Sequence, residues 1–176
     1  MPAVVHTIGH STHPIGEFIE ILQAHDVGTV ADVRTVPKSR RNPQFAQDAL
    51  PAALGGAGIG YRHLKGLGGL RKTSPDSPNG AWRNASFRGY ADHMGTAEFG
   101  SALDELIALA EADPTAIMCA EAVPWRCHRS LIGDALIVRG FEVLDIFSAT
   151  NARPHTLTSF ARVSGTDITY PPEAAA

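Results

Sequence analysis

A short segment, residues 119–129, holds two cysteines, a glutamate, a histidine and two arginines in the order Cys-Ala-Glu-Ala-Val-Pro-Trp-Arg-Cys-His-Arg. A deprotonated thiol is a strong nucleophile, and neighbouring cations or a helix N-terminus lower its pKa. An imidazole beside such a thiol can accept and return a proton near neutral pH. The segment therefore predicts nucleophilic thiol chemistry, and its candidate catalytic groups are Cys119, Glu121, Cys127 and His128.

Two cations of the same segment, Arg126 and Arg129, predict that the substrate is an anion, because guanidinium groups bind phosphates and carboxylates with two parallel hydrogen bonds. A helix is expected to begin near Cys127. The free N–H groups at residues 128–130 would then add to this anion site.

Other uses of these cysteines are alternatives. The loop of a cysteine phosphatase would place its arginine one position earlier than Arg126, and Cys119 and Cys127 have no second pair of ligands with which to form a structural zinc site. A catalytic metal held by His10, Glu121, Cys127 or His128 stays open. Cys119 is also flanked by apolar residues, as is typical of a cysteine with a packing role only.

Polar residues also lie at the ends of other apolar runs. His10 and Ser11 follow the first run, and Asp32 and Arg34 alternate along the second, so that they share one face of a strand. Because the carboxyl ends of parallel strands meet at one edge of a sheet, we expect these residues near the thiols. An Asp32–Arg34 ion pair with a structural role is the alternative. His10 joins the candidates for proton transfer, and the candidate substrate-binding residues are Ser11, Asp32, Arg34, Arg40, Tyr61 and Arg129.

The elements that must position these residues alternate between strand and helix along the chain. Strands are expected at 4–9, 29–36, 58–64, from 116, at 141–147 and at 167–170, and helices at 14–25, 44–54, 99–110 and 127–139. This alternation predicts an α/β protein with layered α/β/α architecture and a mainly parallel sheet. The 176 residues fit one domain, 1–176, with a core at about 4–148, a long glycine- and proline-rich loop at about 65–87 and a loosely ordered end at 171–176.

Charge is unevenly distributed along the chain. The formal net charge is −3, yet residues 33–91 contain ten basic and only two acidic residues. Five aromatic residues are interleaved with these cations, an arrangement that in nucleic-acid-binding proteins holds phosphates while rings stack on bases. The alternative is a solvated basic segment whose aromatic side chains only anchor it to the core. The interleaved aromatics are Phe45, Tyr61, Trp82, Phe87 and Tyr90.

Composition excludes several protein classes. Apolar residues make up 44% and charged residues 19% of the chain, as in globular domains. No run of about 18 apolar residues predicts a membrane span, and no secretory signal is recognised. Two cysteines cannot form a disulfide framework, so a reduced, cytoplasmic protein is expected. No nucleotide-cofactor motif is present.

Several short motifs together resemble the domain of unknown function 488 family. They occur in order over residues 4–148, and the block Cys-Ala-Glu followed by Cys-His-Arg is the most specific. The resemblance implies a small bacterial α/β protein, and it marks His10, Asp32, Arg34, Cys119, Glu121, Cys127, His128 and Arg129 as family residues without supplying a reaction. The other matching motifs are Thr7-Ile8-Gly9-His10-Ser11, Pro37 with Ser39-Arg40, Leu67-Gly68-Gly69 and Phe87-Arg88-Gly89-Tyr90.

These observations lead to one functional hypothesis and two alternatives. The hypothesis is an enzyme that acts on an anionic, phosphate-bearing substrate, a nucleotide or nucleic acid, through a thiol, histidine and glutamate site at the carboxyl ends of the strands. A noncatalytic nucleic-acid-binding module and a metal-dependent hydrolase or lyase are the alternatives.

Overall fold

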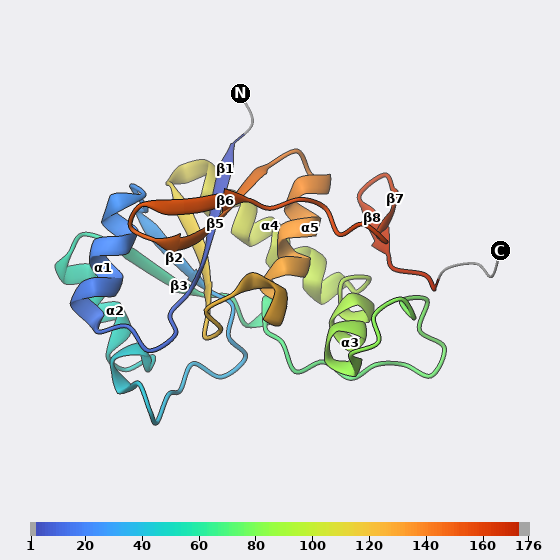
Figure 1. Cartoon of the computed structure of the whole chain (residues 1–176), viewed down its shortest axis with the longest axis horizontal. Coiled ribbons are helices and arrows are strands. Elements are labelled where there is room, and N and C mark those ends of the chain that lie inside the picture. Colours follow the sequence, from blue (N-terminus) through green and yellow to red (C-terminus); the bar gives the residue numbers. More distant parts are fainter. Residues whose placement is uncertain (1–2, 173–176) are drawn as a thin grey trace.

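The computed structural model describes residues 3–172. A six-stranded sheet in the order β3-β2-β4-β1-β5-β6 forms its centre, and every neighbouring pair is parallel except β5 and β6 (Figure 1). A separate antiparallel pair, β7 and β8, follows near the end of the chain. The strands are β1 (Val4–Gly9), β2 (Thr29–Asp32), β3 (Gly60–His63), β4 (Thr115–Cys119), β5 (Glu142–Ser148), β6 (Asn151–Pro154), β7 (Arg162–Ser164) and β8 (Asp167–Thr169).

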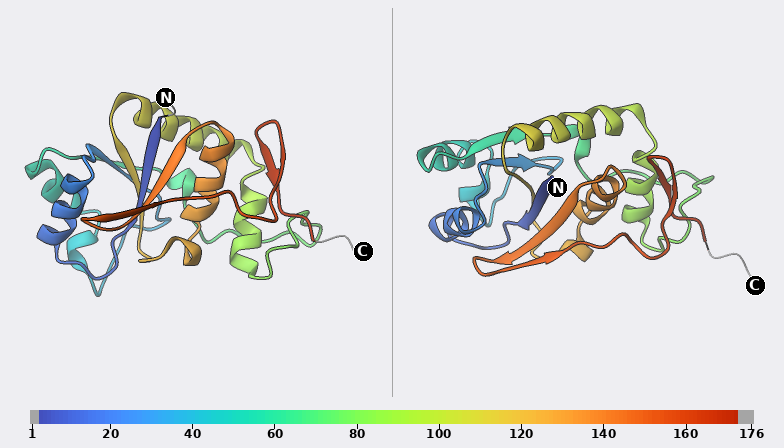
Figure 2. Two further views of the ribbon diagram at one scale, coloured as in Figure 1. Left: turned by 45° about the horizontal axis from the view of Figure 1, so that its top comes forward. Right: turned by 90° about the horizontal axis from the view of Figure 1, so that it is seen from above.

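Helices cover both faces of the sheet, which confirms the expected layered α/β/α architecture. Side chains of β4 alternate between two cores: Ala116 and Met118 pack with α1 and α2, whereas Ile117 and Cys119 pack with α4 and α5. The two helical layers lie on opposite sides of the strands in each view of the molecule (Figure 2). The helices are α1 (Ile15–Ala24), α2 (Leu50–Gly56), α3 (Ala85–His93), α4 (Ala97–Ala112) and α5 (Arg129–Val138).

The two central strands, β1 and β4, define the place where a ligand site is expected. After β1 the chain passes through α1, on one face of the sheet, to β2. After β4 it passes through α5, on the opposite face, to β5. Neighbouring parallel strands whose connections diverge in this way open a crevice beyond their carboxyl ends. Backbone pairing continues past both strands, because His10 N–H donates to the Cys119 carbonyl at 2.9 Å and Ser11 N–H to the Ala120 carbonyl at 3.0 Å.

Gly9 makes this close approach of β1 and β4 sterically feasible. A Cβ at Gly9 would overlap the carbonyl oxygen of Glu121. The residues that follow β1 and β4 are therefore held directly against one another.

Some elements differ from the expectations. The strand expected over 29–36 ends at Asp32, whose carboxylate accepts the Arg34 N–H at 3.0 Å and so turns the chain out of the ladder. The helix expected over 44–54 is instead a 3₁₀ turn at Pro43–Phe45 followed by α2. Pro51 lies in the first turn of α2, where its missing N–H costs no hydrogen bond.

The loop expected over 65–87 also contains regular structure. A 3₁₀ turn occupies Lys65–Leu67, and α3 begins at Ala85. The carboxamide oxygen of Asn84 accepts the N–H groups of Ser86 and Phe87 and so caps α3.

The end of the molecule farthest from α1 is formed by α3 and the β7–β8 pair, which lie side by side in Figure 1. Tyr170, just after β8, is fully buried there; its N–H donates to the side-chain oxygen of Asn79, and its carbonyl accepts the N–H of Ala81. Of the end expected to be loosely ordered, 171–176, residues 173–176 lie outside the described part of the chain. No helix within residues 3–172 is long and apolar enough to cross a membrane.

Candidate functional site

A cavity of about 740 Å³ opens at the carboxyl ends of β1 and β4. This volume lies within the range typical of sites that bind small molecules. Four segments surround it: the turn after β1, the loop after β2, the beginning of α3 with the preceding loop, and the connection from β4 to α5. Lining residues include His10, Ser11, Arg34, Lys38, Arg40, Arg41, Leu70, Phe87, Tyr90, Cys119, Glu121, Arg126, Cys127 and His128.

The two thiols meet at the inner end of this cavity. The Cys127 Sγ lies 2.7 Å from the Cys119 Sγ, and both cysteines are free. Burial raises the pKa of Cys119, but the hydrogen bond from Cys127 and the charge of Arg129 outweigh it and lower this pKa to about 7. The same contact raises the pKa of Cys127 above that of an ordinary thiol. Cys119 is therefore the thiolate of the pair, and Cys127 is the thiol that donates to it.

Arg129 supplies the positive charge beside this thiolate. Its Nη1 donates to the Cys119 Sγ at 2.8 Å and to the Glu121 carbonyl at 2.6 Å. Its Nε donates to the Thr7 hydroxyl, which in turn donates to the Asp145 carboxylate. Arg129 was expected to contact a bound anion, but it is fully buried and outside the cavity lining, and it contacts the thiolate instead.

The N–H groups at the beginning of α5, which were expected to bind an anion, also have partners inside the protein. The backbone N–H of Arg129 points to the Cys127 Sγ at 3.4 Å, and that of Ser130 donates to the Cys127 carbonyl at 3.1 Å. These two donors are therefore engaged by Cys127. Two of the three N–H groups expected to bind an anion are thus occupied, and the exposed cations around the cavity are the remaining charged groups for it.

His128 is a neutral base next to the second thiol. Its Nε2 donates to the Val33 carbonyl at 2.8 Å, so the proton is on Nε2 and the lone pair of Nδ1 lies 3.6 Å from the Cys127 Sγ. Burial lowers the pKa of His128 to about 4. The imidazole is therefore neutral near pH 7, with an acceptor lone pair on the side of Cys127.

His10 and Arg34 form a second polar layer at the cavity. The His10 ring stacks on Phe45, with 4.2 Å between ring centroids, and its Nδ1 donates to the Ser11 carbonyl at 2.9 Å. Its Nε2 faces Nη1 of Arg34 at 3.4 Å, and burial lowers its pKa. His10 is thus a neutral ring whose acceptor nitrogen is directed at a cation.

Asp32 and Tyr61 lie behind this layer rather than in the cavity. Arg34 binds both carboxylate oxygens of Asp32, at 2.9 Å through Nε and 2.7 Å through Nη2, and the Tyr61 hydroxyl donates to the same carboxylate. Asp32 is fully buried, so the ion pair foreseen as the structural alternative is present. Burial and the neighbouring carboxylate raise the pKa of Tyr61. These two residues support Arg34 and do not themselves line the cavity.

The mouth of the cavity is strongly cationic. Lys38, Arg40, Arg41 and Arg126 are exposed there, and within residues 3–172 none of them forms an ion pair. Glu121 is the single acidic residue of the lining. Sequence reasoning had assigned Arg40 to the site but counted Lys38 and Arg41 only within the basic segment.

Apolar side chains form part of the cavity rim. Leu70 is 85% exposed and Val36 is 56% exposed, and both line the cavity. Leu70 also has a positive φ of 60°, which is unusual for a residue with a β-carbon. Large apolar side chains exposed beside a cavity are typical of a binding surface. Sequence reasoning missed this rim because the loop that carries it has no periodicity.

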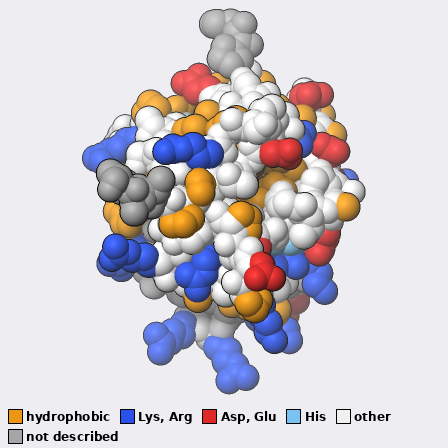
Figure 3. Space-filling model, turned by 90° about the vertical axis from the view of Figure 1, so that its right-hand side faces the viewer, with side chains coloured by type: hydrophobic (Ala, Val, Ile, Leu, Met, Phe, Trp, Pro, Cys, Tyr) orange, Lys and Arg blue, Asp and Glu red, His pale blue; other side chains and the backbone are white. Residues whose placement is uncertain are grey.

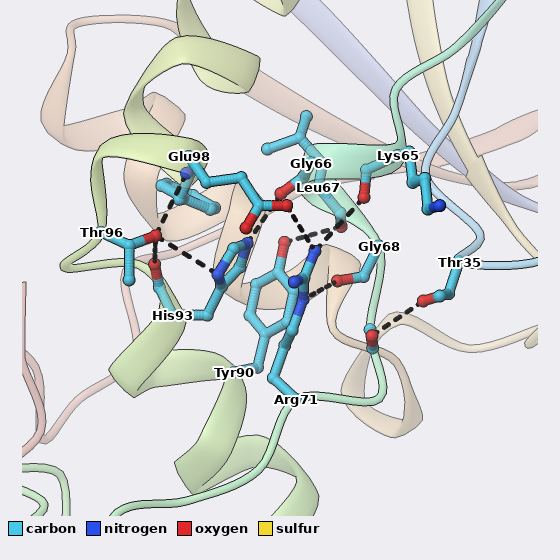
Figure 4. Close-up of polar contacts among 12 residues, drawn as sticks. Thr35, Lys65, Gly66, Leu67, Gly68, Arg71, Tyr90, His93, Thr96 and Glu98 are labelled. Carbon is cyan, nitrogen blue, oxygen red and sulfur yellow. Dashed lines mark hydrogen bonds and ion pairs between the residues drawn. The ribbon is translucent and has the colours of Figure 1, made fainter.

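The loop before Leu70 is fixed in place by α3 and α4 (Figure 4). The Tyr90 hydroxyl donates to the Leu67 carbonyl at 2.8 Å, and His93 Nε2 donates to the Gly66 carbonyl at 2.7 Å. The Nε of Arg71 donates a hydrogen bond to the Gly68 carbonyl at 3.1 Å. This wall of the cavity is thus held by side chains of α3, a helix that the sequence did not predict.

The interleaved aromatic residues are mostly engaged inside the protein. Phe45 and Tyr90 are buried, and Trp82 packs edge-on against Phe160 and Tyr170. This arrangement agrees with the alternative in which the rings anchor the basic segment to the core. Phe87, half-buried, is the aromatic of this set that lines the cavity together with Tyr90.

The described residues, 3–172, contain no group of three or more His, Cys, Asp or Glu side chains arranged to hold a metal ion. His10, Glu121, Cys127 and His128 all line the cavity but are not grouped as ligands. The metal-dependent alternative therefore gains no geometric support from these residues.

The cavity brings together eight of the eleven predicted site residues: Cys119, Glu121, Cys127, His128, His10, Ser11, Arg34 and Arg40. Asp32, Tyr61 and Arg129 lie one layer deeper. Comparison with known proteins gives one match: the family model described as Domain of unknown function DUF488 fits residues 14–136. No curated protein and no solved structure matches the chain.

Proposed function

The chain belongs to the DUF488 family, a domain family of unknown function, and we propose that it is an enzyme acting on an anionic, phosphate-bearing substrate with Cys119 as the nucleophile. The observation that carries this proposal is a thiol of lowered pKa at the inner end of a cavity whose mouth holds four cations that form no ion pair within residues 3–172. A nucleotide or a nucleic-acid end is the substrate class that we favour.

Substrate binding is assigned to the loop after β2 and to the β4–α5 connection. Lys38, Arg40 and Arg41 come from the first and Arg126 from the second, so an anion between them is reached from two sides. Phosphate groups bind several such cations at once. Leu70 and Phe87 supply apolar surface next to the cations, which suits a substrate that carries a base or another organic group beside its phosphate.

Bond formation is assigned to Cys119. The lowered pKa of this thiol, about 7, favours its nucleophilic thiolate form near neutral pH. Its Sγ would attack the electrophilic centre of the substrate and displace the leaving group, which gives a covalent thio-intermediate. Glu121, exposed at the mouth of the cavity, would accept the proton of the water that hydrolyses this intermediate.

A charge-selective alkylation experiment tests the site without knowledge of the substrate. Iodoacetate is anionic and iodoacetamide is neutral, so a cationic cavity favours iodoacetate at Cys119. We expect the ratio of the two alkylation rates to fall several-fold in Arg40→Gln and to stay unchanged in Arg162→Gln, which removes an exposed arginine of β7 outside the cavity. Inorganic pyrophosphate should slow both reagents at Cys119. Equal ratios in the two variants would contradict the assignment of the anion site.

Turnover is then sought with a panel of nucleotides and short oligonucleotides, with release of product measured for each compound. Cys119→Ser should abolish any turnover found, and Cys127→Ser should reduce it, because Cys127 donates the hydrogen bond that stabilises the Cys119 thiolate. Turnover that survives in Cys119→Ser would refute the assignment of Cys119 as the nucleophile.

A noncatalytic nucleic-acid-binding role is the second candidate, and it is favoured by the exposed cations outside the cavity as well as within it. In the view that faces the end of the molecule with α3 and the β7–β8 pair, Lys and Arg side chains gather on the lower part (Figure 3). Binding to an oligonucleotide should then weaken steeply with salt, with a slope set by the number of phosphates contacted. Salt-insensitive or absent binding would reject this role.

A further inference from the structure

We infer that Cys119 and Cys127 form a reversible disulfide, so that the cavity carries a two-electron redox switch. The sequence predicted a reduced protein, and the reduced dithiol is one of the two forms of this switch. The inference rests on the contact between the two sulfur atoms and on the groups around them, and it holds whatever the substrate of the cavity is.

The geometry brings together the two sulfurs and the groups that such a reaction needs. The two Sγ atoms are 2.7 Å apart, and a disulfide bond is about 2.05 Å long. The cysteines come from different elements, with Cys119 at the end of β4 and Cys127 just before α5. Both cysteines are buried but line the cavity, through which a small oxidant can approach them.

The two cysteines differ in the way that an attacking and a resolving thiol differ. Arg129 Nη1, 2.8 Å from the Cys119 Sγ, keeps this sulfur in its nucleophilic form. Cys127 retains its proton, and the lone pair of His128 Nδ1 lies 3.6 Å from its Sγ. A thiol of lowered pKa that lines a cavity and has a second thiol beside it is the arrangement found in redox-sensing cysteines.

The oxidant is a hydroperoxide, and the simplest one is hydrogen peroxide. The Cys119 thiolate attacks one peroxide oxygen, the O–O bond breaks, hydroxide leaves, and Cys119 becomes a sulfenic acid. The Cys127 sulfur then attacks the Cys119 Sγ and gives up its proton. The S–O bond breaks, and the departing hydroxide takes this proton to become water. In total, two thiols and one hydrogen peroxide give one disulfide and two waters, and an external dithiol reverses the oxidation.

Bridging would change the cavity as well as the thiols. The disulfide removes the negative sulfur that Arg129 contacts, and it closes the connection that carries Glu121 and Arg126 into a loop. If the proposed function is correct, oxidation also removes its nucleophile and stops turnover until the bond is reduced. Disulfide formation is measured by mass spectrometry and needs no substrate. A failure of the disulfide proposal can therefore be told apart from a failure of the proposed function.

The test uses the full chain, reduced, freed of reductant and treated with an equimolar amount of hydrogen peroxide. We expect the intact mass to fall by about 2 Da as two thiol hydrogens are lost, and the titratable thiols of the denatured protein to fall from two per chain to none. Peptide mapping should show Cys119 joined to Cys127, and dithiothreitol should restore both thiols.

The Cys127→Ser variant provides the control. Without the resolving thiol, Cys119 should accumulate as a sulfenic acid that dimedone traps, and then oxidise further with a gain of oxygen. Wild-type protein should show little dimedone adduct under the same conditions. If wild-type protein keeps both thiols, or forms the sulfenic adduct to the same extent as the variant, the inference is wrong. The wild-type mass alone decides the matter should the variant fail to fold.

Discussion

The imidazole of His155 links the end of the chain to the core, and its charge should make the stability of the protein depend on pH. Its Nε2 lies 2.9 Å from Oδ1 of Asp134, and its Nδ1 lies 3.6 Å from Oδ2 of Asp145. Burial alone would lower the pKa of His155, but the hydrogen bonds and charges of these two carboxylates raise it to about 9. His155 is therefore charged in the folded protein at neutral pH.

The magnitude follows from the difference between the folded and the unfolded chain. An increase in pKa from 6.5 to about 9 corresponds to about 3 kcal/mol, at 1.36 kcal/mol per pKa unit. Partial exposure of the ring to solvent reduces this to about 2 kcal/mol. Because the folded state binds the proton more tightly, the contribution is complete below pH 6.5, falls as the pH rises and is lost above about pH 9.

Urea unfolding of the wild-type protein and of His155→Gln, followed by tryptophan fluorescence at pH 6 and pH 10, measures this contribution. The variant should be less stable than wild type by about 2 kcal/mol more at pH 6 than at pH 10. Other groups titrate over the same interval, but they do so in both proteins and cancel in the difference. A stability difference that is equal at the two pH values would refute the assignment of a charged His155.

Three further substitutions test the contacts behind the cavity. Thr7→Val leaves the Nε of Arg129 without its acceptor, so we expect the free energy of unfolding to fall by about 1–3 kcal/mol and Cys119 to be alkylated more slowly at pH 7. Thr7→Ser, which keeps the hydroxyl, should restore both. Tyr90→Phe removes a hydrogen bond to a loop carbonyl at 2.8 Å and should cost about 1 kcal/mol in urea unfolding; an unchanged midpoint would show that the cavity wall does not depend on it. Gly9→Ala places a Cβ where a carbonyl oxygen lies, and should cost about 3 kcal/mol or more; Gly16→Ala, whose Cβ would meet nothing within 4 Å, should be tolerated, and equal effects of the two would contradict the steric argument.

The layered fold was predictable because long apolar runs follow clear periods. The parallel core strands are largely buried runs, as in the fully buried run that becomes β4, and α4 repeats its apolar residues at helical spacing. The positions of the thiols, His10 and Arg34 at one edge followed from this alternation and from the rule for carboxyl ends of parallel strands. The cavity that unites them follows from the same topology.

The parts that sequence reasoning missed have weaker local signals. In α3 the apolar residues are interrupted by Arg88 and Gly89, and the loop before it is rich in glycine and proline. Asn84 is a good helix N-cap, and with Phe87 and Tyr90 spaced by three it is the signal that could have revealed the helix. Gly89 is required there for another reason, because a Cβ would overlap the Arg71 carbonyl, and such a long-range contact cannot be read from neighbouring residues.

The arginines show that residue type alone does not reveal which side chains bind an external anion. Arg34, Arg40 and Arg129 all follow or precede strand ends, and all three were expected to bind an external anion. A guanidinium that is buried must find its partners inside the protein, since an unpaired buried charge is far too costly. Arg129 finds a thiolate and two carbonyls, and Arg34 finds a carboxylate, whereas Arg40 stays exposed with no ion pair among residues 3–172. Burial therefore divides one class of residue into two roles: the inner arginines set the ionisation of the site, and the outer ones are left to attract what enters it.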